Sequence, residues 1–220
     1  MTNFWTELPR PFFALAPMED VTDTVFRQIV NKCGAPDVYF TEFTNADGLF
    51  SRGYDYVARR LVHTKSEQPL IAQIWGINPE NFYKAGKLLM ERGFVGIDIN
   101  MGCPEKGIVA RGACSGLINN PALAREIIIA TQEGSCGLPV SVKTRLGVKE
   151  IVTEEWTSFL LGLDLDALII HGRISKEMSS VPAHWDEIGK VVKIRDQMGK
   201  QTAIIGNGDV ASREDGLAKV

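Results

Sequence analysis

The chain has 220 residues, of which 45% are hydrophobic and 23% are charged. These proportions are those of an ordinary globular protein, and they exclude a disordered chain, a collagen-like repeat and a coiled coil. The net charge is −3, whereas proteins that hold nucleic acid by neutralising phosphates are usually basic overall. Charge alone therefore favours an enzyme acting on a small molecule, unless a basic patch lies within the acidic total.

The four cysteines form no C-x-x-C pair, and only three histidines accompany them. Neither a zinc site nor a small disulfide framework is predicted from this spacing. The first residues lack a basic segment followed by an apolar run, and no apolar stretch approaches the ~18 residues that a membrane span needs. We therefore expect a cytoplasmic protein with reduced thiols, no membrane partner and no metal.

Seven short apolar runs recur along the chain and predict strands. They are apolar almost throughout, which is typical of parallel strands buried on both faces of a sheet. The predicted strands cover residues 12–16, 38–43, 70–75, 95–100, 139–145, 167–171 and 202–207.

Helical patterns with recognisable ends lie between these runs. Asn78 is followed by proline and has the character of an N-cap, and Gly93 ends that helix. Asn120, again followed by proline, begins the next helix, and Thr153 begins another. Ser212 starts a segment that resembles a capping box near the end of the sequence.

Alternating strands and helices allow either a doubly wound sheet or a (β/α)8 barrel. The runs begin about 32 residues apart, close to the ~31 residues per unit of a ~250-residue barrel. No G-x-G-x-x-G motif follows the first run, as a dinucleotide-binding sheet would need. We therefore predict that residues 1–220 form one α/β domain, a (β/α)8 TIM barrel truncated after the seventh strand and the start of the following helix.

In a barrel, the chemistry lies where the strands end and the following loops begin. Six of the predicted strands carry polar or reactive residues at this end, and residues converging on one mouth make a site for some ligand. The set comprises Pro17 and Met18, Gln73, Asn100 and Cys103, Lys143 and Arg145, His171 and Arg173, and the turn Asn207-Gly208-Asp209.

Each residue also has a simpler interpretation. Lys143 alternates with apolar residues and should point into the barrel, where an unpaired ammonium is costly, so a ligand or catalytic role is favoured. Gln73 follows the same logic, but it also fits a buried amide that the neighbouring backbone satisfies. Asn207-Gly208-Asp209 also fits a tight turn, and His171 an ordinary residue at a strand end.

Cys103 lies between glycine and proline in a loop, with Lys106 and Arg111 downstream. A cysteine is usually a small buried hydrophobe. A free thiol titrates at a pKa of ~8.5, within reach of neutral pH, so Cys103 suits a nucleophile or a proton donor. The other cysteines, Cys33, Cys114 and Cys136, lie in or beside predicted helices, and we expect them to be structural or incidental.

At these positions the chain resembles the tRNA-dihydrouridine synthase (Dus) family, flavin enzymes built on a (β/α)8 barrel. Five motifs carry the resemblance in order, from about residue 12 to the end of the chain. They read APMEDVTD at 16–23 followed by Phe26-Arg27, NMGCP at 100–104 with Gly112-Ala113 and Leu117, VSVKTRLG at 140–147, HGR at 171–173 and IGNGDV at 205–210.

The resemblance implies FMN at the barrel mouth. Pro17, Met18 and Glu19 would line the flavin ring and Gln73 would bond a ring edge. Lys143 would sit near N1–C2=O, where a cation stabilises the reduced flavin. His171 would contact the flavin, and Asn207, Gly208 and Asp209 would approach its ribityl-phosphate side. Asn100, Arg145 and Arg173 are candidates for binding the substrate.

The implied reaction reduces the C5=C6 bond of a uridine in tRNA. Hydride would come from reduced FMN, and Cys103 would protonate C5 from the opposite face. The uracil would be extruded from the folded tRNA to reach the flavin, and NADPH would reload the flavin. The resemblance also implies a C-terminal helical tRNA-binding domain, which we expect to lie beyond Val220.

Two alternatives remain open. One is another FMN-dependent barrel enzyme acting on a small molecule, similar to dihydroorotate dehydrogenase or old yellow enzyme, which the net charge of −3 fits better. The other is an inactive fragment that binds flavin poorly or binds only RNA.

Overall fold

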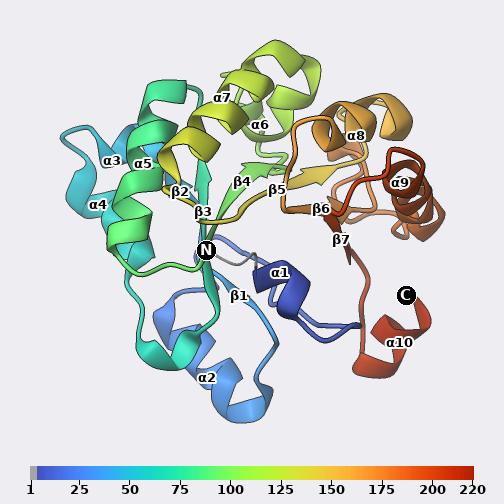
Figure 1. The fold of residues 1–220 in the computed structure, drawn as a ribbon, viewed down its shortest axis with the longest axis horizontal. Coiled ribbons are helices and arrows are strands. Elements are labelled where there is room, and N and C mark those ends of the chain that lie inside the picture. Colours follow the sequence, from blue (N-terminus) through green and yellow to red (C-terminus); the bar gives the residue numbers. More distant parts are fainter. Residues whose placement is uncertain (1–3) are drawn as a thin grey trace. The chain divides into compact units, whose positions relative to one another are not determined.

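The computed structural model describes residues 4–220, so Met1, Thr2 and Asn3, which the predicted domain includes, lie outside the described residues. Strands and helices alternate along the chain (Figure 1). The residues divide into two compact units that interleave in sequence. The first comprises the chain up to Ile99 together with Glu126–Val140, and the second comprises Asn100–Arg125 together with Ser141–Val220. Two of the boundaries fall inside strands and one falls inside a helix, and none lies in a linker.

The first unit is built on parallel strands around β3. β3 pairs with β1 at Tyr39↔Leu70, with β2 at Thr44↔Ile74 and with β4 at Ile71↔Gly96. All of β3 except its last residue is buried, which explains its uninterrupted apolar sequence. The strand bounds are β1 Tyr39–Phe40, β2 Thr44–Asn45, β3 Leu70–Trp75 and β4 Gly96–Met101.

Two longer helices and several short ones accompany these strands. Asn78 caps the long helix α5 by accepting a hydrogen bond from the Glu80 N–H (3.1 Å), as predicted. The helices are α1 Phe4–Glu7, α2 Thr24–Gly34, α3 Ala46–Leu49, α4 Tyr54–Ala58, the 3₁₀ turns η1 Arg59–Leu61 and η2 Lys65–Glu67, and α5 Pro79–Glu91.

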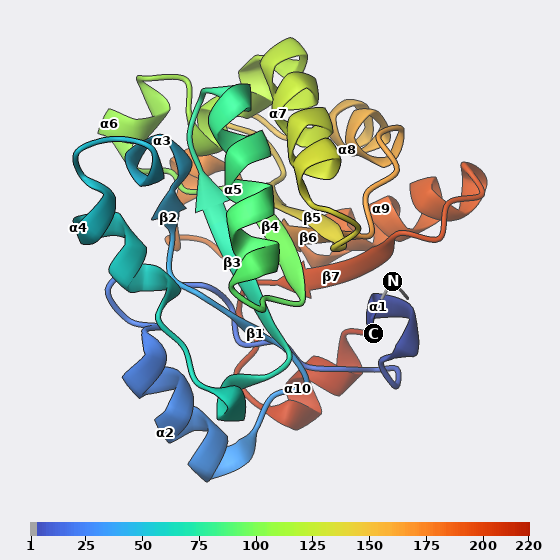
Figure 2. The same ribbon diagram turned by 60° about the vertical axis from the view of Figure 1, so that its left-hand side comes forward.

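Two glycines let α5 approach the helix α7, Pro121–Gly134. A Cβ added at Gly86 would lie 2.6 Å from the carbonyl carbon of Gly134, and one added at Gly134 would lie 2.1 Å from the Tyr83 oxygen. Figures 1 and 2 both show the two helices side by side. Any larger residue at either position would push the helices apart.

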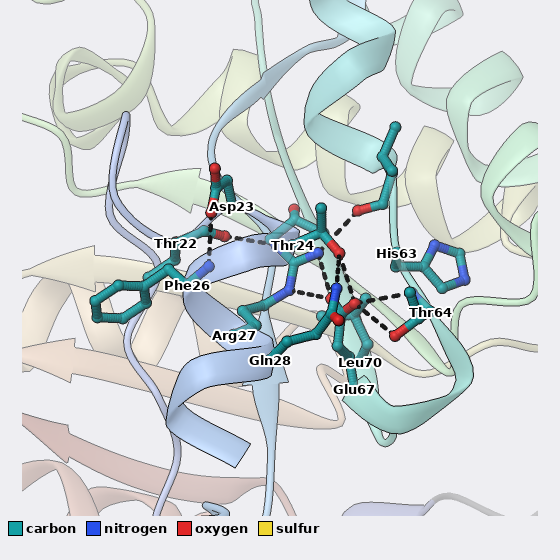
Figure 3. Close-up of polar contacts among 12 residues, drawn as sticks. Thr22, Asp23, Thr24, Phe26, Arg27, Gln28, His63, Thr64, Glu67 and Leu70 are labelled. Carbon is teal, nitrogen blue, oxygen red and sulfur yellow. Dashed lines mark hydrogen bonds and ion pairs between the residues drawn. The ribbon is translucent and has the colours of Figure 1, made fainter. Parts of the chain in front are cut away.

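A fully buried ion pair ties α2 to the segment before β3 (Figure 3). Arg27 Nε donates to Glu67 Oε2 (2.7 Å), and the Arg27 guanidinium also donates to the carbonyl oxygens of Thr22 (2.5 Å) and Val62 (2.9 Å). The hydroxyls of Thr24 and Thr64 donate to the same Glu67 carboxylate. Burial raises the pKa of Glu67, but these hydrogen bonds and the Arg27 charge hold it below its ordinary value.

The second unit holds three parallel strands in register. β5 pairs with β6, and β6 with β7 (Figure 1). In this register His171 pairs with Arg145 on one side and with Asn207 on the other. The strands are β5 Val140–Arg145, β6 Ala167–His171 and β7 Ala203–Asn207. The helices are α6 Lys106–Val109, the 3₁₀ turns η3 Cys114–Asn119 and η4 Ser175–Glu177, α8 Thr153–Leu161, α9 Trp185–Gln197 and α10 Arg213–Ala218.

The predicted strands 70–75 and 167–171 have the observed bounds, and three others are displaced by one residue at one or both ends. The predicted helix starts at Thr153 and Ser212 are also confirmed, since Ser212 Oγ accepts from the Asp215 N–H (3.1 Å).

The predicted strand 12–16 is wrong. Within it, Ala14 forms a single bridge to Val38, and the Phe13 N–H donates to the Asp37 carboxylate (2.7 Å) instead of to a neighbouring strand. Proline at positions 11 and 17 further limits pairing, because proline has no N–H to donate.

The predicted strand 38–43 is shorter than expected. Phe40 in β1 pairs with Ile71, and Thr44 in β2 pairs with Ile74. The segment from Phe40 to Thr44 is therefore one residue longer than the segment of β3 that it faces. An extra residue bulges and bends a strand, which splits the run into β1 and β2.

Among residues 4–220, no helix combines the length and the apolar character that a membrane crossing requires.

Candidate active site

The candidate active site in the second unit lies at the carboxyl ends of β5, β6 and β7. Lys143, on β5, donates from its ammonium to Asn207 Oδ1 at the end of β7 (3.0 Å). His171 ends β6, the strand between β5 and β7, and it pairs with Arg145 on one side and with Asn207 on the other. Parallel strands end at the same edge of a sheet, so residues far apart in sequence meet there.

Arg173 joins His171 to the turn after β7. Its guanidinium donates to both carboxylate oxygens of Asp209 (2.5 and 2.6 Å), to His171 Nε2 (3.1 Å) and to the carbonyl oxygen of Val181 (2.6 Å). These bonds, and a further one from the Ala183 N–H (2.8 Å), lower the pKa of Asp209. The Asp209 carboxylate therefore holds Arg173 in place.

His171 is neutral at physiological pH. Burial, and then the charges of Arg145, Lys143 and Arg173, lower its pKa to about 3, against the opposing charge of Asp209. An arginine can only donate, so Nε2 of His171 is the acceptor and its proton lies on Nδ1. The ring is thus a neutral hydrogen-bond donor among cations.

Gly208 needs to be glycine for two reasons. Its φ of +115° is open to few other residues, and an added Cβ would lie 2.9 Å from Ala183 Cβ and 3.1 Å from the His171 ring. The Trp185 indole N–H donates to the Gly208 carbonyl (2.9 Å). The tight-turn interpretation of this segment is therefore correct for its backbone, and it does not exclude a ligand.

The Cys103 loop is held from three directions. Asn100 Oδ1 accepts from the N–H groups of Gly102 and Cys103 (both 3.0 Å). Arg145 Nε donates to the Gly102 carbonyl (2.8 Å), and the Ser115 N–H donates to the Cys103 carbonyl (3.3 Å). These bonds fix the backbone of the loop, and Cys103 itself is half-buried.

The pKa of Cys103 is lowered to about 7, chiefly by hydrogen bonding with the buried thiol of Cys114, against the opposing effect of burial, and the Arg145 charge lowers it further. The same bond, together with burial, raises the pKa of Cys114 well above its ordinary value. We expected Cys114 to be structural or incidental, and no spacing signal in the sequence indicates its contact with Cys103.

Arg145 connects the Cys103 loop to the segment that follows β6. Besides Gly102, it donates through Nη1 to the carbonyl oxygens of Ile174 and Met178 (both 3.2 Å), in the segment that follows β6. Burial lowers its pKa. The Arg145 guanidinium thus donates several of its hydrogen bonds to groups of the chain itself, and so does the Arg173 guanidinium.

The remaining predicted site residues lie in the first unit. Gln73 is fully buried, and its Nε2 donates to Asp98 Oδ2 (2.7 Å), so a carboxylate and not only backbone satisfies this amide. Glu19 accepts from Arg60 Nε (2.8 Å) and from the Phe43 N–H (3.1 Å). Met18 is 39% exposed, and Pro17 precedes it in the same loop.

Within residues 4–220, no three or more His, Cys, Asp or Glu side chains gather in a way that could hold a metal ion.

A family model for dihydrouridine synthase (Dus) matches residues 14–220. A probable tRNA-dihydrouridine synthase 2 of Bacillus subtilis (strain 168) is 51% identical over 217 residues, and a probable tRNA-dihydrouridine synthase of Staphylococcus aureus (strain COL) is 49% identical over 217 residues. Each alignment covers 98% of this chain and 66% of the relative. The chain therefore spans just under two thirds of the length of these curated relatives.

Solved structures show the fold. An old yellow enzyme homologue from Zymomonas mobilis has a TM-score of 0.62 at 11% identity, covering 94% of this chain and 80% of its own. Morphinone reductase in complex with tetrahydroNAD has a TM-score of 0.59 at 12% identity, covering 94% and 78%. These similarities confirm the predicted α/β fold of the TIM-barrel type. At such low identity they carry no argument about activity.

Proposed function

Because the chain belongs to the dihydrouridine synthase family, we propose that residues 1–220 are the FMN-binding catalytic part of a tRNA-dihydrouridine synthase. The reaction is reduction of the C5=C6 bond of a uridine in tRNA, with NADPH as the reductant, in the cytoplasm. The observation that carries the proposal is the Cys103 loop: a backbone fixed by hydrogen bonds that holds a half-buried cysteine beside Arg145 at the end of β5.

Cys103 has the properties of a general acid. A proton donor works best when its pKa lies near the operating pH, because both protonation states are then populated during turnover. The pKa of about 7 meets this condition. The bonds from Asn100, Arg145 and Ser115 fix the loop, so the thiol needs little reordering to reach a substrate carbon.

The second unit fits FMN by the chemistry of its side chains. Lys143, Arg145 and Arg173 act together on His171, and so strong a cationic field suits an anionic group. In this proposal Lys143, His171, Asn207, Gly208 and Asp209 hold the flavin, with Asp209 acting by fixing Arg173. FMN, when bound, supplies the hydride that adds to the uracil ring.

Pro17, Met18, Glu19 and Gln73 remain predicted flavin ligands on the evidence of the family motifs. The contact that Glu19 makes within the chain indicates how this residue would act. Glu19 is paired with Arg60, and its proposed role is therefore to fix the backbone of the loop that carries Pro17 and Met18.

Asn100, Arg145 and Arg173 remain proposed substrate contacts. Each already makes bonds within the chain, from Asn100 to its own loop and from the two arginines to backbone or Asp209. Each would therefore contribute to substrate binding from a fixed position rather than by closing around the substrate.

The proposal is tested by incubating the purified chain with FMN, NADPH and unmodified tRNA and measuring dihydrouridine by mass spectrometry. We expect dihydrouridine to accumulate, and Cys103→Ala to abolish it while flavin still binds. NADPH oxidation without dihydrouridine would instead favour a small-molecule reductase. That alternative is the one that the net charge of −3 suggests.

A further inference from the structure

Trp185, the first residue of α9, contacts the turn that follows β7 without belonging to it. Its indole N–H donates to the carbonyl oxygen of Gly208 (2.9 Å). Its ring lies against Gly206, where an added Cβ would meet two ring carbons at 2.3 and 2.6 Å. Trp185 therefore packs on the end of the strand and also bonds to the turn itself.

A cation holds the same ring. The Lys219 ammonium lies 5.5 Å from the centroid of the Trp185 ring and forms an ion pair with Asp215 in α10. A cation over an indole is attracted by the quadrupole of the ring. The half-buried Trp185 is thus held by packing, by a hydrogen bond and by a cation–π contact, and its ring is fixed in the second unit.

The segment just before α9 is bonded to the same turn and to the end of β6. The Ala183 N–H donates to Asp209 Oδ2 (2.8 Å), and the His184 N–H donates to the Gly172 carbonyl (2.6 Å). The Gly172 N–H in turn donates to the Asn207 carbonyl (3.0 Å). These bonds place the start of α9 beside the turn, so a change at the start of α9 acts on the turn directly.

The turn needs such support because glycine has more backbone freedom than any other residue. Gly208 holds a φ of +115°, and the groups around it must select this conformation from the others open to glycine. The hydrogen bond from Trp185 fixes the carbonyl of this residue. The N–H groups and side chains on either side of Gly208 are thereby fixed as well.

The turn also carries an excess of positive charge. The Lys143 ammonium donates to Asn207 Oδ1 (3.0 Å), and the Arg173 guanidinium donates to both oxygens of Asp209 (2.5 and 2.6 Å). These two positive charges exceed the single negative charge of Asp209. An anion is therefore favoured beside the turn. The oxidised ring of a flavin carries no net charge, whereas the phosphate of FMN is an anion.

We propose that Trp185 is a positioning residue for FMN: by bonding the Gly208 carbonyl and packing on Gly206, it fixes the turn Asn207-Gly208-Asp209 in the conformation that receives the phosphate. The inference rests on the proposed function, in which this turn holds the flavin. Trp185 acts through the turn and makes no contact with the flavin itself. Its loss should therefore weaken the binding of FMN more than that of riboflavin, which lacks the phosphate.

The test compares the Kd of FMN with that of riboflavin by quenching of flavin fluorescence. We expect the parent to bind FMN more tightly. Trp185→Phe keeps an aromatic ring but loses the N–H, and it should raise the Kd of FMN about tenfold and that of riboflavin no more than about twofold. Gly206→Ala should give the same pattern, because its Cβ displaces the ring while the indole N–H is still present.

Trp156→Phe is the matched control. Trp156 is a buried tryptophan of the same unit, and its indole N–H donates to Thr144 Oγ1 at the same distance of 2.9 Å. Its substitution should lower the stability of the protein and leave the preference for FMN over riboflavin unchanged. Hydrogen exchange of the flavin-free protein, followed by mass spectrometry, measures the turn itself. Trp185→Phe should speed exchange in residues 205–211, and Trp156→Phe should not.

Three outcomes would overturn the inference: a parent that binds riboflavin as tightly as FMN, equal losses of affinity for both flavins in Trp185→Phe, or exchange in the turn that this variant leaves unchanged. The same loss of preference in Trp156→Phe would reduce the effect to general destabilisation and would also contradict it. A parent that binds neither flavin would refute the proposed function, while the exchange measurement would still decide whether Trp185 holds the turn.

Discussion

Each of the two units buries a group of charged side chains, but the groups differ in how their charges are balanced. In the first unit, Arg27 and Glu67 are both fully buried, and each satisfies the other with help from threonine hydroxyls and backbone (Figure 3). In the second unit, burial and then the charges of Arg145, Lys143 and Arg173 lower the pKa of His171 and keep it neutral. A balanced network fixes structure, whereas an excess of one sign shifts the pKa values of its neighbours and prepares a site for a ligand.

The largest expected effect is on activity, from a substitution of Cys103 in the second unit. Cys103→Ala should lower dihydrouridine formation by about 10²–10⁴-fold, the usual contribution of a general acid. FMN binding should change little, since the thiol serves the substrate. Single-turnover assays with prereduced flavin would measure the loss. Cys33→Ala, at an exposed position, is the control, and a Cys103 variant with an unchanged rate would identify another proton donor.

The balanced network should respond in stability rather than in activity. Glu67→Gln leaves the Arg27 charge buried without its partner, and we expect it to lower the free energy of unfolding by about 3–5 kcal/mol. Urea unfolding monitored by circular dichroism would measure this. The double variant Arg27→Met/Glu67→Leu removes both charges and should recover much of the loss. A single variant as stable as the parent would show that the pair does not hold α2 in place.

Removing one cation should weaken the proposed flavin site without unfolding the protein. Lys143→Met keeps most of the side-chain volume but loses the bond to Asn207 and the positive charge. We expect FMN affinity to fall by about 1.5–3 kcal/mol, the range for a hydrogen bond to a charged group. Quenching of flavin fluorescence gives the Kd. Lys190→Met, at an exposed lysine paired with Glu187, should leave the Kd unchanged.

The burial of His171, together with the cations around it, should also make stability depend on pH. The pKa of His171 is lowered in the folded state to about 3, so the unfolded chain binds a proton first as the pH falls below its usual value of ~6.5. The stabilisation is therefore complete above pH ~6.5 and is lost toward pH 3. We expect a loss of about 2 kcal/mol by pH 5 from this group. His171→Asn should flatten this part of the profile; an unchanged slope would mean that His171 titrates normally.

The smallest expected effect concerns the start of α2 in the first unit. Asp23 Oδ1 accepts from the Phe26 N–H (2.8 Å) and caps this helix. Asp23→Ala should cost about 1 kcal/mol in the free energy of unfolding, and Asp23→Ser should cost less because serine is also a good cap. A loss several times larger would show that the cap and the Arg27–Glu67 pair act as one unit.

Much of the second unit could be predicted before its structure was seen. The bounds of β6 follow from a five-residue apolar run, and the meeting of Lys143, His171 and Asn207 follows from the rule that parallel strands end at one edge. The cap at Ser212 follows from its local sequence. These features depend on interactions that repeat along the chain or lie within one turn, so the sequence alone specifies them.

Other features depended on contacts between distant residues. The segment 12–16 reads as a strand, yet it bridges only at Ala14 because Asp37 takes the Phe13 N–H. Glu19 is predicted from the family motif to line the flavin ring, and nothing in that motif indicates that Arg60 donates to its carboxylate. No local pattern shows which distant side chain will satisfy a given polar group, since that choice is made by packing.

The sequence by itself determined the alternation of strands and helices, the family and the reactive loop around Cys103, because periodicity, helix caps and motif spacing are local properties. Only the tertiary structure decided how that loop is held. It brought Arg145 to the Gly102 carbonyl and the buried Cys114 thiol to Cys103, and the resulting charges and hydrogen bonds shift the pKa of Cys103 to about 7. A pKa depends on burial, charge and hydrogen bonding within a few ångströms, and those surroundings exist only once the chain has folded.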